Sequence, residues 1–377
     1  MTLTPVFVLA AVLALQAFGD VGDPPWARAP QVTADSPSVP DIQAAVERLP
    51  EGGTVRVPAG RAEAIGTVRV PAGVSLIAPG PGKTVMFRAS GTDSGASDPI
   101  LRLEGAPDKP SQIAGISFIG MKDPASKSWD TAVAMMNVTQ FRVDHCRFER
   151  FGAAAVSVRG HCSGVVDHCL FVDNFKKPIA NVGYGVVIMG PGDWREDVRA
   201  GTGDSVFVED CEFTGSRHAV ASNAGAWYVF RHNHVHGNDN SQAIDAHGPG
   251  YGSKRGTQWV EVYNNLVEKP VGGSVAVMLR GGGGLVFGNT VRDYKTGIVL
   301  TLDFDGKLDW SRPYPIPDQI HKVWCWQNTL NGAPAAPVIP KRSADHIKAE
   351  RDFFACPMPD YKPFEYPHPL ARGGPLD

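Results

Sequence analysis

Hydrophobic and polar residues alternate over short runs of β-branched residues through the middle of this chain, and each run ends at Gly, Asn or Asp. This period of two predicts β-strands rather than helices. One pattern recurs, ending at Phe148, Phe171, Phe213, Val235, Val267, Val291 and Leu330 (VDHCRF, VDHCLF, VEDCEF, FRHNHV, VYNNLV, VFGNTV and VWCWQNTL). Its register position is Cys146, Cys169, Cys211, Asn233, Asn265, Asn289 and Asn328, with spacings of 23, 42, 22, 32, 24 and 39 residues. A base period of about 22 to 24 residues with insertions predicts a solenoid.

Short strands at this period predict an all-β parallel β-helix, in which Cys stacks on Cys and Asn on Asn from coil to coil. Stacked Asn side chains hydrogen-bond along the axis and so satisfy polar groups that are costly to bury alone. The Leu-x-x-Leu-x-Leu spacing of leucine-rich repeats is absent.

The two ends of a solenoid need covers, since each would otherwise expose an open strand edge. Residues 40–48 place Ile42, Ala45 and Val46 on one helical face, which predicts an N-terminal capping helix. The β-helix is expected over residues 40–330, starting with GGTVRVPAG at Gly52. Residues 331–377 contain nine prolines and no repeat, which predicts an irregular Pro-rich C-terminal tail or cap.

With this cap, the GGTVRVPAG segment and the V-x-x-N/C-x-F/V ladder, residues 40–330 resemble the pectin-lyase-like right-handed parallel β-helix superfamily. The resemblance implies a secreted carbohydrate-active protein, because the group contains polysaccharide lyases, hydrolases and epimerases. It does not select one reaction, since this fold supports many.

The N-terminal segment is apolar over residues 6–18 and turns polar at Asp20. It predicts a signal peptide over residues 1–19, a linker over 20–39, and a secreted or periplasmic protein. The alternative, a membrane anchor, needs a longer apolar run. The chain has 36 Lys and Arg against 39 Asp and Glu, a balance that argues against nucleic acid as a partner.

Six cysteines are present, an even number that suggests disulfides in an exported protein. Three of them occupy the predicted interior ladder, where a free Cys behaves as a small apolar residue. A bridge between Cys325 and Cys356 is the favoured pairing.

A second strand follows each ladder position, and its outward residues define a candidate groove. Aligning the inward positions places four residues at one level: Arg159, Ser222, His247 and Arg280. The preceding outward position on these strands, two residues earlier, is occupied by Val220, Asp245 and Met278. His218 occupies the outward position two residues before Val220. With coils about 4.8 Å apart, His218, Asp245, His247 and Arg280 are expected to share one face.

The insertions fall after this same strand, at residues 190–204, 248–258 and 303–320, and loops at one corner of successive coils wall off a groove. They supply residues suited to sugars and anions: Trp194, Arg195, Tyr251, Lys254, Arg255, Trp310, Arg312 and Tyr314. The alternative for each charged residue is a solvated surface position.

The leading hypothesis is β-elimination on a uronic-acid polysaccharide, with an acidic polysaccharide or oligosaccharide as partner. The reaction needs a cation to neutralise the carboxylate, and groups to remove and supply a proton. Arg280 or Arg217 could neutralise, and His247, His218 or Lys254 could move the proton. Arg159 is a further candidate clamp, and His218 with Asp245 could instead form a structural pair.

The chain also resembles β-helix lyases of the alginate lyase and chondroitinase B type, in which a Lys and an Arg on adjacent coils act together. Lys254 before VEVYNN and Arg280 in MLRGGGGLVFGN have a similar layout, although a glycine run replaces the His that often follows that Arg. Calcium, which some of those enzymes use, needs clustered carboxylates, and none is evident beside these residues.

Two other functions remain open. A glycoside hydrolase needs two carboxylates, for which Asp245 could pair with Asp303 or Asp305; a non-catalytic glycan-binding protein would use the groove without reaction. No cofactor motif is present, and no metal site is predicted, although His232, His234 and His236 form an H-x-H-x-H string that could suggest zinc. His145, His168 and His232 share one turn position and are expected to be structural.

Overall fold

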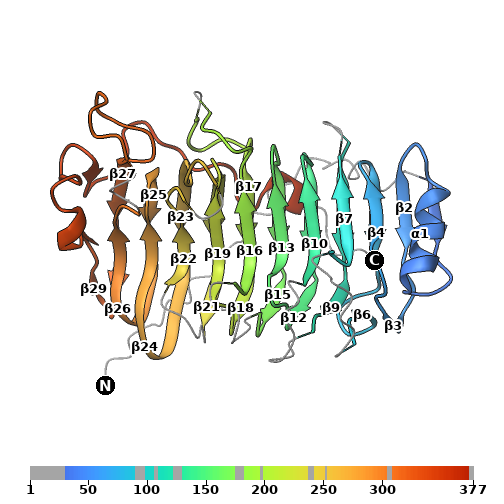
Figure 1. Cartoon of the computed structure of the whole chain (residues 1–377). Helices are drawn as coiled ribbons and strands as arrows, with labels where there is room; N and C mark the ends of the chain where they lie inside the picture. The colour runs from blue at the N-terminus through green and yellow to red at the C-terminus, as the bar shows by residue number, and fades with distance from the viewer. Residues whose placement is uncertain are drawn as a thin grey trace, which may run out of the picture.

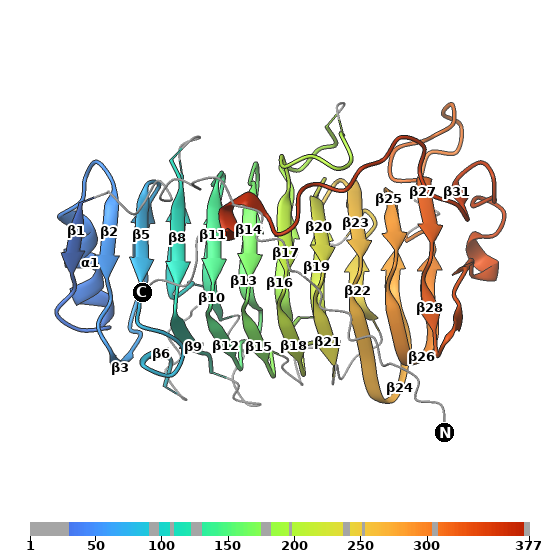
Figure 2. The same cartoon turned by 180° about the vertical axis from the view of Figure 1, so that it is seen from behind.

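The computed structural model describes residues 30–89, 98–105, 109–121, 130–174, 182–195, 198–236, 242–250, 253–303 and 308–372. They wind into an elongated coil whose walls are three ladders of parallel strands (Figures 1 and 2). The predicted parallel β-helix is therefore confirmed. The expected signal peptide lies outside the described residues, and among those that are described no helix is long and apolar enough to cross a bilayer.

Ladder A is a 12-stranded sheet. Its strands, in spatial order, are β1 (Gln31–Thr33), β2 (Gly53–Arg56), β5 (Val74–Ile77), β8 (Ser111–Ala114), β11 (Phe141–Asp144), β14 (Gly164–Asp167), β17 (Val206–Glu209), β20 (Trp227–Arg231), β23 (Trp259–Tyr263), β25 (Gly282–Phe287), β27 (Ile320–Trp326) and β31 (Phe353–Phe354).

Ladders B and C merge into one sheet, because β24 (Leu266–Leu279) and β26 (Thr290–Leu300) run through both. Ladder B also contains β3 (Gly60–Glu63), β6 (Thr84–Phe87), β9 (Ile116–Ile119), β12 (Arg147–Glu149), β15 (Leu170–Val172), β18 (Glu212–Thr214), β21 (His234–His236), β28 (Thr329–Leu330) and the antiparallel β29 (Ala333–Pro334). Ladder C contains β4 (Val68–Pro71), β7 (Leu101–Glu104), β10 (Thr131–Met136), β13 (Ala154–Arg159), β16 (Tyr184–Met189), β19 (His218–Asn223), β22 (Gln242–Ala246) and β30 (Pro337–Val338).

The predicted Cys and Asn ladder lies in the interior between ladders A and B. Each Asn accepts a hydrogen bond from the backbone N–H of the ladder residue before it: the donors Asn233, Asn265 and Asn289 lie 3.0, 3.1 and 3.1 Å away from the next side-chain oxygen. The ladder changes chemistry at Cys211, whose N–H donates to Asn233 Oδ1 at 3.0 Å. Buried amides are thus satisfied by repetition along the axis.

The residue before each ladder position adopts the left-handed conformation at which the chain turns a corner. These residues are His145, His168, Asp210, His232, Asn264, Gly288 and Gln327, with φ between 48° and 64°. His, Asp and Asn are enriched in this conformation, and the rings of His145 and His168 stack 5.1 Å apart. The structural interpretation of these histidines is confirmed.

The capping helix α1 (Val39–Glu47) covers the first coil, as predicted, and begins two residues before Asp41. Ser38 is its N-cap, and the Ser38 hydroxyl accepts a hydrogen bond from the Asp41 N–H at 3.3 Å. One face of the helix is buried against the coil, and it consists of Val39, Ile42, Ala45 and Val46.

The C-terminal segment is both a cap and a strap. Strands β30 and β31 extend ladders C and A past the last coil. The chain then runs back along ladder A (Figure 2) to the short 3-10 helix η3 (Pro369–Ala371). We call residues 358–372 the strap.

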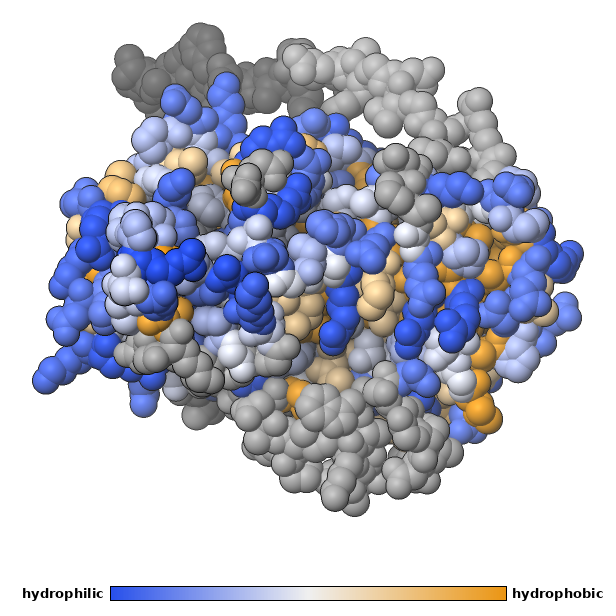
Figure 3. Space-filling model, turned by 45° about the horizontal axis from the view of Figure 1, so that its top comes forward, coloured by the Kyte–Doolittle hydropathy of each residue, from blue (hydrophilic) through white to orange (hydrophobic). Residues whose placement is uncertain are grey.

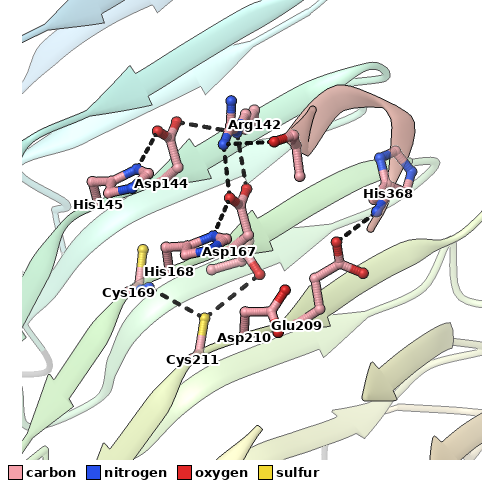
Figure 4. Close-up of polar contacts among 12 residues, drawn as sticks. Arg142, Asp144, His145, Asp167, His168, Cys169, Glu209, Asp210, Cys211 and His368 are labelled. Atoms are coloured by element: carbon pink, nitrogen blue, oxygen red, sulfur yellow. Dashed lines mark hydrogen bonds and ion pairs between the residues drawn. The ribbon is translucent and has the colours of Figure 1, made fainter. Parts of the chain in front are cut away.

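Buried ion pairs of ladder A lie under the strap. Arg142 binds both carboxylate oxygens of Asp167 at 3.0 and 2.8 Å (Figure 4). Arg231 pairs with Glu209 at 2.6 Å and also donates to the strap carbonyls of Phe364 and Glu365. The strap therefore completes hydrogen bonding that these buried guanidinium groups require.

The predicted Cys325–Cys356 disulfide is wrong, because all six thiols are free. Cys325 is buried in β27, whereas Cys356 is exposed beyond β31. Cys325 belongs to the hydrophobic interior, whereas Cys356 lies on the surface of the tail, so the wall of the coil separates the two sulfurs.

Candidate functional site

A groove of about 650 Å³ lies on the outer side of ladder C. Strands β10, β13, β16, β19 and β22 contribute to it, together with the residue that follows β24. Its charged or ring-bearing polar lining residues are Arg159, Tyr184, Arg217, His247 and Arg280. A smaller hollow beside it, lined by Arg102, Met136 and Arg159 among others, continues toward the N-terminal coils.

The surface seen in Figure 3 is hydrophilic over the C-terminal coils on the left and carries more hydrophobic residues toward the N-terminal coils on the right.

The register of ladder C confirms most of the predicted alignment. Arg280 directly follows Leu279, which pairs with Ala246, and His247 directly follows Ala246. Arg280 and His247 are therefore level on adjacent coils. Arg159 pairs with Met189 and Met189 with Asn223, so Arg159 belongs to the same outward level.

The predicted positions of Ser222 and Val220 are wrong by one residue. Ser222 pairs with Ala246 and Val220 with the interior Ile244, so Asn223 is the residue level with His247. The segment HAVASN has small residues on both parities, Ala219 and Ala221 on one and Ser222 on the other, and small residues fit either side of a strand. The alternation alone therefore did not fix the register.

Asp245 is the centre of the site. Its carboxylate is fully buried and accepts two hydrogen bonds from Arg280, from Nε to Oδ1 at 2.8 Å and from Nη2 to Oδ2 at 2.6 Å. Oδ2 also lies 3.2 Å from His247 Nε2 and 3.4 Å from His218 Nε2. Burial opposes its charge, but the neighbouring imidazole hydrogen bond and cation prevail and hold the pKa of Asp245 well below its usual range.

His218 is fully buried behind this carboxylate. Its Nδ1 lies 2.6 Å from the carbonyl oxygen of Gln242, so Nδ1 carries the proton and donates it. Desolvation is the main reason that the pKa of His218 is lowered to about 3. The ring of Tyr184 stacks on it at 5.6 Å. His218 is thus a neutral imidazole whose Nε2 lone pair faces Asp245.

The groove also carries two cations that are not part of the Asp245 cluster. Arg217 Nη1 donates to the Tyr184 hydroxyl at 3.1 Å, and its guanidinium lies 5.7 Å from the Tyr184 ring centroid. Arg159 donates to Ser157 at 3.4 Å. Desolvation raises the pKa of Tyr184, which keeps this phenol protonated at neutral pH.

Tyr184 was missed in the sequence. It begins β16, within the 42-residue interval between two ladder positions. The short apolar run GVVIMG after Tyr184, bounded by glycines, is the signal that could have identified this strand.

Several predicted site residues lie elsewhere. The exposed Lys254 is not among the residues that line the groove. Arg255 is tied to Asp193 at 3.1 Å and to Asp318 at 3.2 Å, so it joins two loops. Because Arg255 binds Asp193, this part of the loop folds toward Asp193.

The predicted aromatic residues do not gather at the groove either. Trp194 donates from Nε1 to the Gly256 carbonyl at 3.1 Å, and Trp310 stacks on His346 at 3.7 Å. Both rings therefore pack the loops around them. Tyr251 and Asp305 lie outside the described residues.

The carboxylates proposed for hydrolysis are joined by one cation. Arg280 Nη1 lies 3.3 Å from Asp303 while its other nitrogens hold Asp245. A glycosidase needs one carboxyl with a raised pKa as general acid, and the ion pairing of Asp245 acts in the opposite direction.

The H-x-H-x-H string does not form a cluster. His234 pairs with Glu268 and His236 with Glu212, each at 2.8 Å. Within the described part of the chain, the one group of three or more His, Cys, Asp or Glu residues with the spacing of metal ligands is His218, Asp245 and His247.

Comparison with known proteins gives a match by structure only. No family model matches the chain, and no curated protein matches it by sequence. It is similar to an alginate lyase from Paenibacillus sp. str. FPU-7, at a TM-score of 0.56 and 12% identity over 81% of this chain and 97% of that one.

Two further structures are similar to it. A hyperthermoactive exopolygalacturonase from Thermotoga maritima has a TM-score of 0.55 and 11% identity, over 82% of each chain. A mannuronic acid specific family 6 polysaccharide lyase from human gut microbiota has a TM-score of 0.50 and 15% identity, over 88% of this chain and 91% of that one. The chain spans 57% of the length of Geobacillus virus E2 ORF18, at a TM-score of 0.49.

At 11 to 15% identity these matches concern the fold. The chain has the right-handed parallel β-helix fold that these structures share.

Proposed function

We propose that this protein is a polysaccharide lyase that cleaves a uronic-acid-containing polysaccharide by β-elimination in the ladder C groove. The observation that carries the proposal is that one groove brings a carboxylate-bound imidazole, His247, together with the cations Arg217 and Arg159. An imidazole can move a proton at neutral pH, and guanidinium groups recognise carboxylates.

The uronate carboxylate must be neutralised before the adjacent C–H proton can be removed. Arg280 is less suited to this role than the sequence suggested, because Asp245 occupies its Nε and Nη2 edge. Arg217 and Arg159 line the groove without a salt bridge to a carboxylate among the described residues. We assign the neutralising contact to Arg217, and carboxylate binding at a neighbouring sugar to Arg159.

His247 is the group assigned to remove the proton. When its Nε2–H donates to Asp245, the lone pair of the neutral ring is on Nδ1, and the carboxylate stabilises the imidazolium formed when Nδ1 takes the proton. Arg280 holds Asp245 in place and is a positioning residue. The Tyr184 hydroxyl, protonated and beside Arg217, is assigned to donate a proton to the leaving oxygen.

The test is the ultraviolet absorbance of the unsaturated uronate product, followed with a panel of acidic polysaccharides. The wild type is expected to produce it on at least one substrate. His247→Ala and Arg217→Met are expected to lose about 10²- to 10⁴-fold in rate, and the exposed control Lys254→Ala is expected to keep it.

Each other outcome contradicts the proposal in a different way. Reducing ends without this absorbance would indicate hydrolysis. Saturable binding of a polysaccharide without any cleavage would indicate a glycan-binding protein. Equal loss in Lys254→Ala would show that the chemistry lies outside this groove.

A further inference from the structure

The buried side of the groove contains a set of side-chain atoms that the elimination chemistry does not fully use. His218 Nε2, Asp245 Oδ2 and His247 Nε2 come from β19, from β22 and from the residue after β22, and the ligand atoms of the three residues lie within 4.8 Å of one another. We infer that these residues form a binding site for a divalent transition metal of the zinc class.

The distances suit such an ion. Asp245 Oδ2 lies 3.4 Å from His218 Nε2 and 3.2 Å from His247 Nε2. Two ligands bound at roughly 2.0 to 2.1 Å in a tetrahedral site lie about 3.3 Å apart. Two imidazoles and one carboxylate are also a donor set preferred by zinc, whereas calcium takes oxygen ligands.

His218 gives the second, independent observation. Its Nε2 is buried and has no hydrogen-bond partner among the residues that the structure describes, although buried polar atoms are normally satisfied. Because Nδ1 donates to the Gln242 carbonyl at 2.6 Å, Nε2 carries a lone pair rather than a proton. A lone pair facing a carboxylate oxygen at 3.4 Å is unfavourable until a cation lies between them.

The surrounding contacts are those of a metal site's outer shell. Ligand imidazoles usually donate their second N–H to a backbone carbonyl or carboxylate, and ligand carboxylates are themselves hydrogen-bonded. His218 meets the first condition through Gln242, and Asp245 meets the second through Arg280. His247 is 11% exposed in its side chain, so an ion can enter from the groove.

The charges of the cluster also favour a cation. Asp245 and Asp303 are two carboxylates that share one guanidinium, Arg280. With both imidazoles neutral, the cluster has an excess of one negative charge. The guanidinium lies 2.6 Å from Oδ2 and uses one lone pair of that oxygen, which leaves the other for the ion.

Metal binding and proton transfer by His247 exclude each other. An ion on Nε2 keeps the ring proton of His247 on Nδ1, so the loaded imidazole cannot take a proton from a substrate. Zinc is therefore expected to inhibit the proposed elimination in the wild type, and a chelator is expected to restore it.

The direct test is titration of the full chain, freed of metal by a chelator, with Zn²⁺ in a calorimeter and with Co²⁺ in a spectrophotometer. We expect one equivalent of each ion and the intense visible absorption of tetrahedral Co²⁺. His218→Ala and His247→Ala, each checked for folding by circular dichroism, are expected to bind at least 10- to 100-fold more weakly. The control His234→Ala/His236→Ala removes the surface string and is expected to bind normally.

Three results would overturn the inference: no stoichiometric binding by the wild type, full binding by both His218→Ala and His247→Ala, or loss of binding in the surface control. Elimination activity is measured separately in the metal-free protein. A chain that eliminates but binds no zinc would therefore refute the metal site alone.

Discussion

The Asp245–Arg280 pair allows the clearest prediction about stability. Asp245 is fully buried, and the Arg280 side chain is 13% exposed. Removing one partner of a buried, hydrogen-bonded ion pair typically costs about 3 to 5 kcal/mol, because the other charge stays desolvated. Asp245→Asn also turns one acceptor oxygen into an NH2 group that meets the donors of Arg280 and His247. We expect it to lower the free energy of unfolding by about 3 to 5 kcal/mol.

The companion variant Arg280→Met is expected to have a similar cost, since it leaves Asp245 with only the two imidazoles. The double variant should cost less than the sum of the single ones, with a coupling of about 0.5 to 3 kcal/mol. Arg292→Met is the matched control. Its partner Glu268 is at the surface and the Arg292 side chain is 57% exposed, so its loss is expected to be below about 1 kcal/mol.

Urea unfolding followed by tryptophan fluorescence measures these free energies. The reasoning is refuted if Asp245→Asn is no more destabilising than the surface control, or if the effects of Asp245→Asn and Arg280→Met simply add. Additivity would mean that the two side chains do not act as a pair in solution.

Three further predictions follow from the interior and the strap. Asn265→Ala leaves the buried N–H of Asn233 unsatisfied and should cost about 1 to 3 kcal/mol in urea unfolding, whereas Asn265→Cys, which repeats the chemistry of the Cys coils, should recover part of that loss. In the folded protein the pKa of His218 is lowered from 6.5 to about 3. The contribution of neutral His218 to stability is therefore complete above pH 6.5 and is lost as the pH falls toward 3. His218→Gln should flatten the pH dependence of Tm over that interval, and an unchanged slope would contradict the burial of a neutral imidazole at this position. Tyr361→Phe removes the 2.6 Å hydrogen bond to buried Glu261 and should lower stability by about 1 to 3 kcal/mol, with no change in elimination rate because the strap lies on ladder A.

The fold could be predicted because repetition encodes it. Each coil repeats one Cys or Asn at one interior position, and the alternation of apolar and polar residues within each period of 22 to 24 residues favours strands over helices. The left-handed turns at His145 and His168 repeat in the same way. A feature that recurs on several coils is visible in one sequence, since each coil serves as a copy of the others.

The site could be predicted only in part, because it depends on features that occur once. Asp245, His247 and Arg280 were found because they interrupt an apolar alternation. Tyr184 was missed inside a long interval, and Lys254 and Trp194 were misplaced because the direction in which a loop folds is not encoded by where it is inserted. The metal-type cluster depends on where His218 stands relative to the next coil, and the misaligned strand His218–Asn223 obscured that position.

The central claim is that the ladder C groove performs elimination, and the masses of the products test it most directly. A defined uronic-acid oligosaccharide is digested by the metal-free protein and analysed by mass spectrometry. Elimination adds no atoms, so the account predicts product pairs whose masses sum to that of the substrate, and their loss in His247→Ala. Product pairs that together exceed the substrate by one water molecule would mean hydrolysis and would contradict the account.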